Sequence, residues 1–302
     1  MLKISKKGVV RSDLILDRVS ATVSIESASE RAWINAGIEK LKASLAYAGE
    51  ARGRYKAGVR VYVGDVMDRT MLIQANPWLP SLSYFRVEYN PAKVASGAIR
   101  AFIEKTLPGG WGRFVQSAKC TRIDLAVDVT GMRVSDVLVY WPGMRRSRQI
   151  FGSGHVFEDS YLQTREVGAY DGDRHLTIYD RSEQIRKQNK KLILKEDVPL
   201  GDVTRFEFRI RPRAEWSQVA SMKNVFDEVN VSEVGNFYGA NDLSFRRFLR
   251  LCQVDGAQNT LLMYSEAERK AFRKMLSQAY APWWDSAEIW KNFNPMLSAH
   301  LG

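Results

Sequence analysis

The stretch TRIDLAVDVT, residues 121–130, constrains the fold more than any other part of the sequence. Ile123, Leu125 and Val127 alternate with polar or small residues, and this period of two is typical of a β-strand with one buried face. The opposite face carries three charged side chains, those of Arg122, Asp124 and Asp128. We interpret the stretch as an inner strand that places two carboxylates and an arginine on one surface of a sheet.

Strands and helices follow each other in two similar rounds up to about residue 215. Each round contains an Arg-x-Glu strand, at residues 86–88 and 205–207. Strands are predicted at 18–25, 58–65, 70–77, 83–91, 120–131, 148–155, 162–170, 175–181 and 203–213, and helices at 26–48, 92–107, 133–141 and 182–191. This order predicts an α+β fold, with a mostly antiparallel sheet from two similar α+β halves, helices on one face and a C-terminal helical region. We expect one domain at residues 1–215, made of halves at about 1–115 and 116–215, followed by a helical region at 216–302.

The charge of the chain favours a polyanionic partner. Its 302 residues include 45 Lys and Arg against 34 Asp and Glu, a formal net charge of +11. Lysines and arginines that neutralise phosphates release counterions and gain affinity, so nucleic acid is the favoured partner, although a basic soluble surface is the plainer alternative. No apolar run is long enough for a transmembrane helix, and the basic N-terminus lacks the apolar core of a secretory signal. A cytoplasmic protein without a membrane partner is expected.

The two cysteines, Cys120 and Cys252, lie far apart and outside any metal-binding spacing. We expect them to be small buried side chains in a reducing compartment. Zinc is not expected, because paired cysteines and His/Cys clusters are missing from the sequence.

The predicted strands share a polar face that is rich in arginine, carboxylate and tyrosine. In residues 205–211 this face carries Arg205, Glu207, Arg209 and Arg211, and in residues 175–179 it carries His175, Thr177 and Tyr179. Carboxylates among arginines are commonly structural ion pairs, and they also provide the oxygen ligands that Mg²⁺ and Mn²⁺ prefer. A tyrosine at a strand end can attack a phosphodiester, although most tyrosines are packing residues. The residue pattern alone leaves both alternatives open.

Three motifs together resemble the rolling-circle replication initiators of plasmids and phages, of the Rep-trans type that includes related relaxases. They are CTRIDLAVDVT, then LTIYDRSEQ, then TRFEFRIR, and EYNP after Arg86 is also similar. The resemblance covers residues 80–215. It implies a metal-dependent DNA endonuclease and strand transferase, which nicks an origin, holds the 5′ end on a tyrosine and later rejoins the strand.

The resemblance assigns roles to individual residues. It implies that Tyr179 is the nucleophile, with Glu183 at the junction motif and Arg205 and Arg209 at the scissile phosphate. The implied metal ligands for Mg²⁺ or Mn²⁺ are Asp124 and Glu207, with Asp128 as a further candidate. The implied partner is origin DNA, single-stranded or hairpin, and a host helicase and a second copy of the chain are further candidates.

Basic residues are candidates for contacts to the DNA backbone, although a solvated face explains any single one of them equally well. The candidates are Arg122, Arg181, Arg145, Arg146, Lys187, Lys190, Lys191 and Arg211.

Two positions depart from the pattern of the family. Arg181 stands where Lys is usual after Tyr-Asp, and Thr177 stands where many members have Arg. These departures support a second hypothesis, a DNA-binding replication or regulatory factor that keeps the fold without the chemistry. The histidine-metal nickases do not fit, because no His-hydrophobic-His pair is present.

Overall fold

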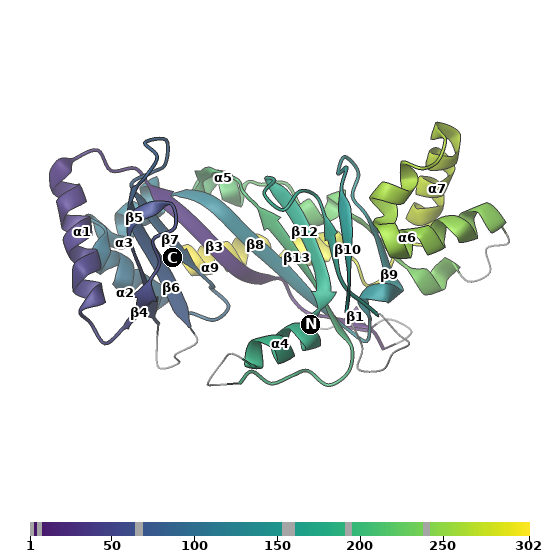
Figure 1. The fold of residues 1–302 in the computed structure, drawn as a ribbon, viewed down its shortest axis with the longest axis horizontal. Helices are drawn as coiled ribbons and strands as arrows, with labels where there is room; N and C mark the ends of the chain where they lie inside the picture. The colour runs from purple at the N-terminus through teal and green to yellow at the C-terminus, as the bar shows by residue number, and fades with distance from the viewer. Residues whose placement is uncertain (1–2, 5–7, 64–68, 153–160, 191–194, 238–241) are drawn as a thin grey trace.

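The computed structural model describes residues 3–4, 8–63, 69–152, 161–190, 195–237 and 242–302. In this part of the chain one antiparallel sheet of 13 strands runs along the molecule (Figure 1). Its main path is β10-β11-β12-β13-β8-β3-β7-β6-β5-β4. The strands are β3 (Ile15–Val23), β4 (Tyr47–Glu50), β5 (Tyr55–Tyr62), β6 (Thr70–Pro77), β7 (Phe85–Tyr89), β8 (Lys119–Thr130), β10 (Ser147–Gly152), β11 (Tyr161–Val167), β12 (Arg174–Asp180) and β13 (Val203–Ile210). Three short strands, β1 (Lys3–Ile4), β2 (Val10–Arg11) and β14 (Ala214–Glu215), join it at the side.

The sheet consists of two halves with the same strand order. In the first half β3 pairs with β7, and β6, β5 and β4 follow outward. In the second half β8 pairs with β13, and β12, β11 and β10 follow outward. The halves join where β3 pairs with β8. The predicted α+β fold from two similar halves is therefore confirmed.

Helices cover the apolar face of both halves and share one hydrophobic core with it. Ile34 and Ile38 of α1, Phe114 of α3 and Phe293 of α9 belong to this core, together with Phe206 from the centre of the sheet. The other sheet face carries no core cluster among the described residues. The covering helices are α1 (Ala28–Lys42), α2 (Ser96–Thr106), α3 (Gly110–Ser117), α5 (Trp216–Ala220), α8 (Ser286–Trp290) and α9 (Phe293–Leu301).

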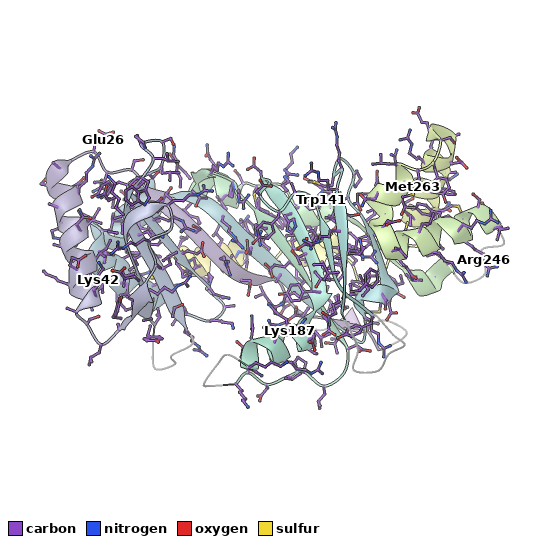
Figure 2. All side chains as sticks on the ribbon, in the orientation of Figure 1. Glu26, Lys42, Trp141, Lys187, Arg246 and Met263 are labelled. Atoms are coloured by element: carbon purple, nitrogen blue, oxygen red, sulfur yellow. The ribbon has the colours of Figure 1, made fainter. Side chains whose placement is uncertain are left out.

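The remaining helices lie outside this layer. In Figure 1, α4 (Arg181–Asn189) lies along the lower edge of the sheet, where Figure 2 labels its Lys187. At the right-hand end, α6 (Leu243–Leu261) and α7 (Glu266–Gln278) form a second core cluster, and Figure 2 labels Arg246 and Met263 there. A two-stranded sheet of β9 (Val137–Tyr140) and β15 (Asn230–Glu233) adjoins them. The described residues also include three 3₁₀ helices, η1 (Val134–Asp136), η2 (Val225–Glu228) and η3 (Val234–Phe237).

Some predicted elements differ from the structure. The helix expected at 133–141 is η1 followed by strand β9, because the β-branched Val137 and Val139 favour an extended backbone. The helix expected at 26–48 ends at Lys42, and Leu45 beyond it is fully exposed. The helix expected at 92–107 begins at Ser96 and ends at Thr106, before the Pro-Gly-Gly stretch, and α3 begins directly at Gly110.

The C-terminal region contributes to the main core as well as to the second cluster. Trp283 and Trp284 are almost fully buried, and the ring of Trp284 lies 4.8 Å from that of Phe206. Both side chains therefore pack in the core. Cys120 and Cys252 are free and buried, as expected. Within the described ranges no helix is long and apolar enough to cross a bilayer.

Candidate functional site

The register of three neighbouring strands brings the predicted site residues onto one face. Tyr179 on β12 lies opposite Arg205 on β13, which lies opposite Asp128 on β8. Two residues before Tyr179 on β12, Thr177 lies opposite Glu207 on β13. Residues directly opposite each other in adjacent strands point to the same face, so all of these side chains lie on the polar surface that the main core leaves free.

Tyr179 and Glu207 are in direct contact. The Oη atom of Tyr179 donates a hydrogen bond of 3.0 Å to Oε2 of Glu207. Burial and the charge of Glu207 raise the pKa of the Tyr179 phenol, whereas Arg205 and Arg181 act against this rise. Burial, with repulsion from Asp124 and Asp17, raises the pKa of Glu207. The pair therefore combines a shielded phenol with a carboxylate of increased basicity.

Arg205 is held by Asp128 in a bidentate ion pair. Its Nε and Nη2 atoms donate hydrogen bonds of 2.6 and 2.7 Å to the two carboxylate oxygens. Burial disfavours the charge of Arg205, but the hydrogen bonds and attraction from Asp128 outweigh burial and raise its pKa. Both oxygens of Asp128 are thus engaged by a guanidinium.

Asp124 is fully buried among three arginines. Arg122 donates hydrogen bonds to both carboxylate oxygens of Asp124, and its Nε atom lies 2.8 Å from Oδ1. The Nε atoms of Arg18 and Arg209 each lie 3.8 Å from the same carboxylate. A buried carboxylate with this many positive neighbours needs no metal ion for neutralisation. Asp124 therefore organises the arginines of the polar face.

Asp17 also belongs to this cluster, and the sequence analysis missed it. Leu16 lies opposite Leu125 and Arg18 lies opposite Asp124, so Asp17 is the extra residue of a β-bulge in β3. A bulge places adjacent side chains on the same face and often re-aims one of them near a functional site. Asp17 lies 3.5 Å from Arg205 and accepts a hydrogen bond from Asn90. The signal in the sequence was a charged Asp-Arg pair inside the apolar stretch LILDRVSATV.

The carboxylates do not form a compact metal site. No group of three or more His, Cys, Asp or Glu side chains suited to hold a metal occurs in the part of the chain that the structure describes. Within this described cluster, Glu207 and Asp17 are the carboxylates without a bidentate arginine partner, and repulsion from Asp17 contributes to the raised pKa of Glu207, which a cation would relieve. One or two carboxylates, completed by waters and substrate phosphates, suffice for Mg²⁺.

A pocket of about 290 Å³ opens beside Tyr179. Thr177 and Thr164 contribute to it from the sheet, and Glu183 and Lys187 contribute from the first two turns of α4. Asp180 caps this helix, because its side chain accepts a hydrogen bond of 2.9 Å from the backbone N–H of Glu183. The cap fixes the strand-to-helix junction directly after Tyr179, so the phenol, Glu183 and Lys187 border the same space.

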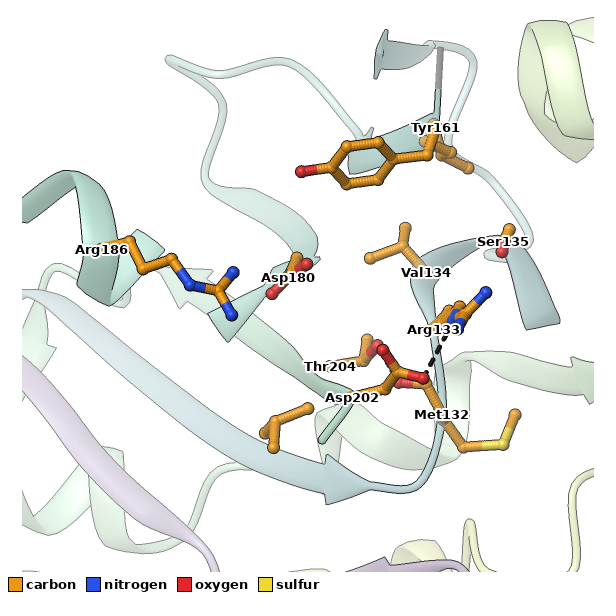
Figure 3. Close-up of a pocket in the computed structure, with 11 residues that line it drawn as sticks. Met132, Arg133, Val134, Ser135, Tyr161, Asp180, Arg186, Asp202 and Thr204 are labelled. Atoms are coloured by element: carbon orange, nitrogen blue, oxygen red, sulfur yellow. Dashed lines mark hydrogen bonds and ion pairs between the residues drawn. The ribbon is translucent and has the colours of Figure 1, made fainter. Parts of the chain in front are cut away.

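A second pocket, of about 330 Å³, lies on the other side of Asp180 (Figure 3). Arg186 enters it from α4 and Tyr161 from β11, and Arg133 forms an ion pair of 2.9 Å with Asp202. Tyr179 does not line this pocket, so it is separate from the space beside the phenol.

Several predicted residues lie near the site but are engaged by protein groups. The guanidinium of Arg209 lies under the ring of Tyr170, 4.7 Å from its centre, and donates a hydrogen bond to the Tyr170 carbonyl. Arg181 pairs with Gln184 and Glu196. His175 is buried beside Tyr170, and burial together with nearby arginines lowers its pKa to about 4, so it is neutral at pH 7.

The other predicted DNA contacts are spread over the molecule. Arg211 donates to the carbonyls of Asp171 and Gly172 and thus holds the β11–β12 turn. Arg145 and Arg146 are exposed just before β10, near the end of β12 opposite to Tyr179. Lys187 and Lys190 are exposed on α4 and at its end, whereas Lys191 lies outside the described residues.

Comparisons with known proteins find similarity to a solved structure. No protein-family model and no curated protein matches the chain. A solved structure, that of a rolling circle replication initiator protein from Geobacillus stearothermophilus, is similar over 83% of this chain and 99% of that chain, with 16% sequence identity and a TM-score of 0.41.

Proposed function

We propose that the chain is a DNA strand transferase that initiates rolling-circle replication, with Tyr179 as the nucleophile. The observation that carries the proposal is the hydrogen bond from the Tyr179 phenol to Glu207, on an arginine-rich face beside an open pocket. Phosphodiester chemistry needs a nucleophile, a base and positive charge near the phosphate, and these residue types meet here. The motifs that resemble Rep-trans initiators include both members of the pair.

The proposed step is a transesterification. The proton of Tyr179 Oη moves to Oε2 of Glu207 while the phenolate oxygen forms a bond to phosphorus. The bond from phosphorus to the 3′ oxygen breaks, and this oxygen takes a proton from solvent and leaves as a hydroxyl. The 5′ phosphate stays on the tyrosine, so rejoining is the same step in reverse.

Arg205 and Arg181 act through charge at the phenol. Both lower the pKa of Tyr179, and thus favour the phenolate, although burial and Glu207 have larger opposite effects. Arg205 is too deeply buried and too fully paired with Asp128 to wrap around a phosphate. Arg18 is the better phosphate contact on this face, because 42% of its side chain is exposed. Glu183 borders the pocket and orients Lys187 through an ion pair.

A divalent metal, Mg²⁺ or Mn²⁺, is part of the proposal, with Glu207 and Asp17 as the residues that would hold it. When bound there, it would neutralise charge that develops on the phosphate. Asp124 and Asp128, which the resemblance offered as ligands, have an arginine-pairing role in this scheme. Origin DNA is the proposed substrate, and a host helicase and a second copy of the chain stay predictions.

Covalent trapping tests the proposal. The chain is incubated with Mn²⁺ and a library of labelled single-stranded oligonucleotides with random cores, and adducts are separated on denaturing gels. We expect a labelled protein band with the wild type and with Tyr264→Phe, a control tyrosine in the α6–α7 cluster, and none with Tyr179→Phe. An adduct that persists in Tyr179→Phe would contradict the assignment of the nucleophile.

The alternative is a DNA-binding replication or regulatory factor without nuclease chemistry. The burial of Tyr179 and the arginine pairing of Asp124 and Asp128 favour it. DNA binding without any adduct or nick, across Mg²⁺ and Mn²⁺ and the whole library, would support this function over strand transfer.

A further inference from the structure

The two halves of the sheet match residue by residue around their Arg-x-Glu strands. In the second half Arg205 lies between Tyr179 and Asp128 in the neighbouring strands. In the first half Arg86 lies between Gln74 and Thr22 in the same way. Glu88 likewise takes the place of Glu207, opposite Ser20 as Glu207 is opposite Ala126. The strand order and the register therefore relate the halves by an approximate two-fold axis at the β3–β8 pair.

Both half-sites lie on the same face and are linked by Arg18. This residue lies opposite Asp124, next to the joint of the halves, and its guanidinium is 3.8 Å from Asp124 and 3.5 Å from Glu88. Gln74 and Tyr179 are separated by five strand spacings, about 24 Å across the sheet. They are also offset along the strands, because Thr22 and Asp128 lie on opposite sides of the Arg18–Asp124 pair. The polar face thus carries two related positions on either side of a central arginine.

The first half-site keeps the arginine and the glutamate but has no phenol. The Oε1 atom of Gln74 accepts a hydrogen bond from Arg86, and its Nε2 atom donates to the carbonyls of Ala51 and Arg52. Gln74 thereby anchors the turn before β5 instead of offering a nucleophile. The position that matches Tyr179 in this half therefore offers no nucleophile to a DNA strand.

Strand β5 of the first half carries positive charge on the polar face, whereas the matching strand β11 of the second half does not. Lys56 and Arg60 alternate with Gly58 on β5, and Gly58 lies opposite Gln74, so both cations point to the polar face and both are exposed. The position matching Arg60 in β11 is Glu166, opposite Thr177. Lys56 also lies 5.3 Å from the ring of Trp78, which is exposed. Arg52 and Arg54 add exposed charge in the adjoining turn, and Glu50 pairs with Arg52.

We infer that the first half of the sheet is a second nucleic-acid site, which holds the complementary strand of a DNA stem without cutting it. This inference rests on the proposed function. The two strands of a stem run antiparallel and are related by two-fold axes, as are the two halves of the sheet. One DNA strand then lies at Tyr179 and the other at Lys56 and Arg60, and only the first meets a tyrosine that is hydrogen-bonded to a glutamate at the matched position.

Binding measurements test this inference in a Tyr179→Phe background, where strand transfer does not interfere. The probes are a labelled DNA hairpin with a single-stranded arm, and the same arm without the stem. The variant is Lys56→Gln with Arg60→Gln. The matched control, Lys40→Gln with Lys105→Gln, makes the same charge change on α1 and α2, which cover the opposite face. All four side chains are exposed, so the fold should persist.

We expect the Lys56/Arg60 variant to lose hairpin affinity by about 30-fold at 0.15 M salt and the slope of log K against log salt to fall by about 1.8, the effect of two lost phosphate contacts. Affinity for the arm alone, and all binding by the control variant, should stay unchanged. Unchanged hairpin affinity, or an equal loss for the arm and the hairpin, would overturn the inference. Failure of the proposed function would be seen in a different measurement, as the absence of a covalent adduct.

Discussion

The phenol of Tyr179 on β12 donates a hydrogen bond to the carboxylate of Glu207 on β13, although the two residues are 28 positions apart in the chain. The antiparallel register brings them together, since Tyr179 faces Arg205 and Glu207 is two residues further along. The contact is short enough for direct proton transfer. It is the feature on which the account of function depends.

Replacing Glu207 with Gln should lower the rate of adduct formation by about 100-fold to 10,000-fold, the usual contribution of a positioned general base. The fold should not suffer, because the amide removes a charge whose burial is unfavourable. Single-turnover gel kinetics measure the rate. Glu26→Gln, an exposed glutamate far along the sheet that Figure 2 labels, is the control and should keep the wild-type rate.

The wild-type rate should depend on pH in the direction that Glu207 sets. Its carboxyl must be ionised to accept the proton, and its pKa is raised in the metal-free protein, so at low Mn²⁺ concentration the rate falls on acidification at a pH above the ordinary value of 4.5. Higher Mn²⁺ concentration should shift this fall to lower pH, because a bound cation relieves the repulsion from the neighbouring carboxylates. Folding stability shows the opposite trend. The folded state binds this proton more tightly, so the contribution of Glu207 to stability decreases as pH rises from 4.5 through the raised pKa. A rate that is flat through this range would contradict the role of Glu207 as the base.

Replacing Asp128 with Asn should destabilise the fold by about 3 kcal/mol, because it leaves the buried guanidinium of Arg205 without its bidentate partner. Chemical denaturation followed by circular dichroism measures this free energy. Asp173→Asn is the matched control, since Asp173 pairs with Arg213 and both side chains are largely exposed. Asp173→Asn should lower the free energy of unfolding by less than about 1 kcal/mol. Equal stability of the two variants would contradict the structural role of Asp128.

Replacing Asp17 with Asn should raise the Mn²⁺ concentration that gives half-maximal adduct formation by at least about 10-fold. Asp17 is one of the two carboxylates proposed to hold the metal, and the amide is a weaker ligand. The measurement is the adduct yield across a Mn²⁺ titration. Asp13→Asn, a change of the same kind at an exposed position before β3, is the control. An unchanged Mn²⁺ dependence in Asp17→Asn would remove this residue from the metal site.

Replacing Arg165 with Met should stabilise the fold by about 1–4 kcal/mol. Arg165 on β11 is fully buried, its three guanidinium nitrogens have no hydrogen-bond partner among the described residues, and burial lowers its pKa to about 10. Thermal and chemical denaturation measure the gain. Arg148→Met, at an exposed position of the adjacent strand β10, should change stability little. A large loss of stability in Arg165→Met would mean that the guanidinium has a partner in solution.

The sequence predicted the inner strands well because their alternation is strong. In β8, Asp124 and Asp128 share the polar face that the period of two implied, and Ile123 and Val127 belong to the core. The two Arg-x-Glu strands also correctly indicated two similar halves. Residues 133–141 were mistaken for a helix, because a short apolar run carries no period that separates a helix from a buried strand.

The site was predicted less completely, because periodicity gives the face of a side chain but not its partner. It placed Asp124, Asp128 and Glu207 on one face, but it could not show that arginines engage both aspartates. Asp17 was missed because a bulge, which depends on the pairing of β3 with β8, turns it toward the cluster. Strand pairing is long-range information, and a single strand does not encode it locally.

The most direct test of the account is to locate the covalent link between protein and DNA. After trapping with Mn²⁺ and the selected oligonucleotide, the DNA is digested, the protein is cleaved with trypsin, and tandem mass spectrometry identifies the modified peptide. Residues 175–181 form one tryptic peptide, in which Tyr179 is the one tyrosine. The account predicts a phosphonucleotide on Tyr179 of this peptide. A phosphonucleotide on any other residue, or none at all from an active preparation, would contradict it.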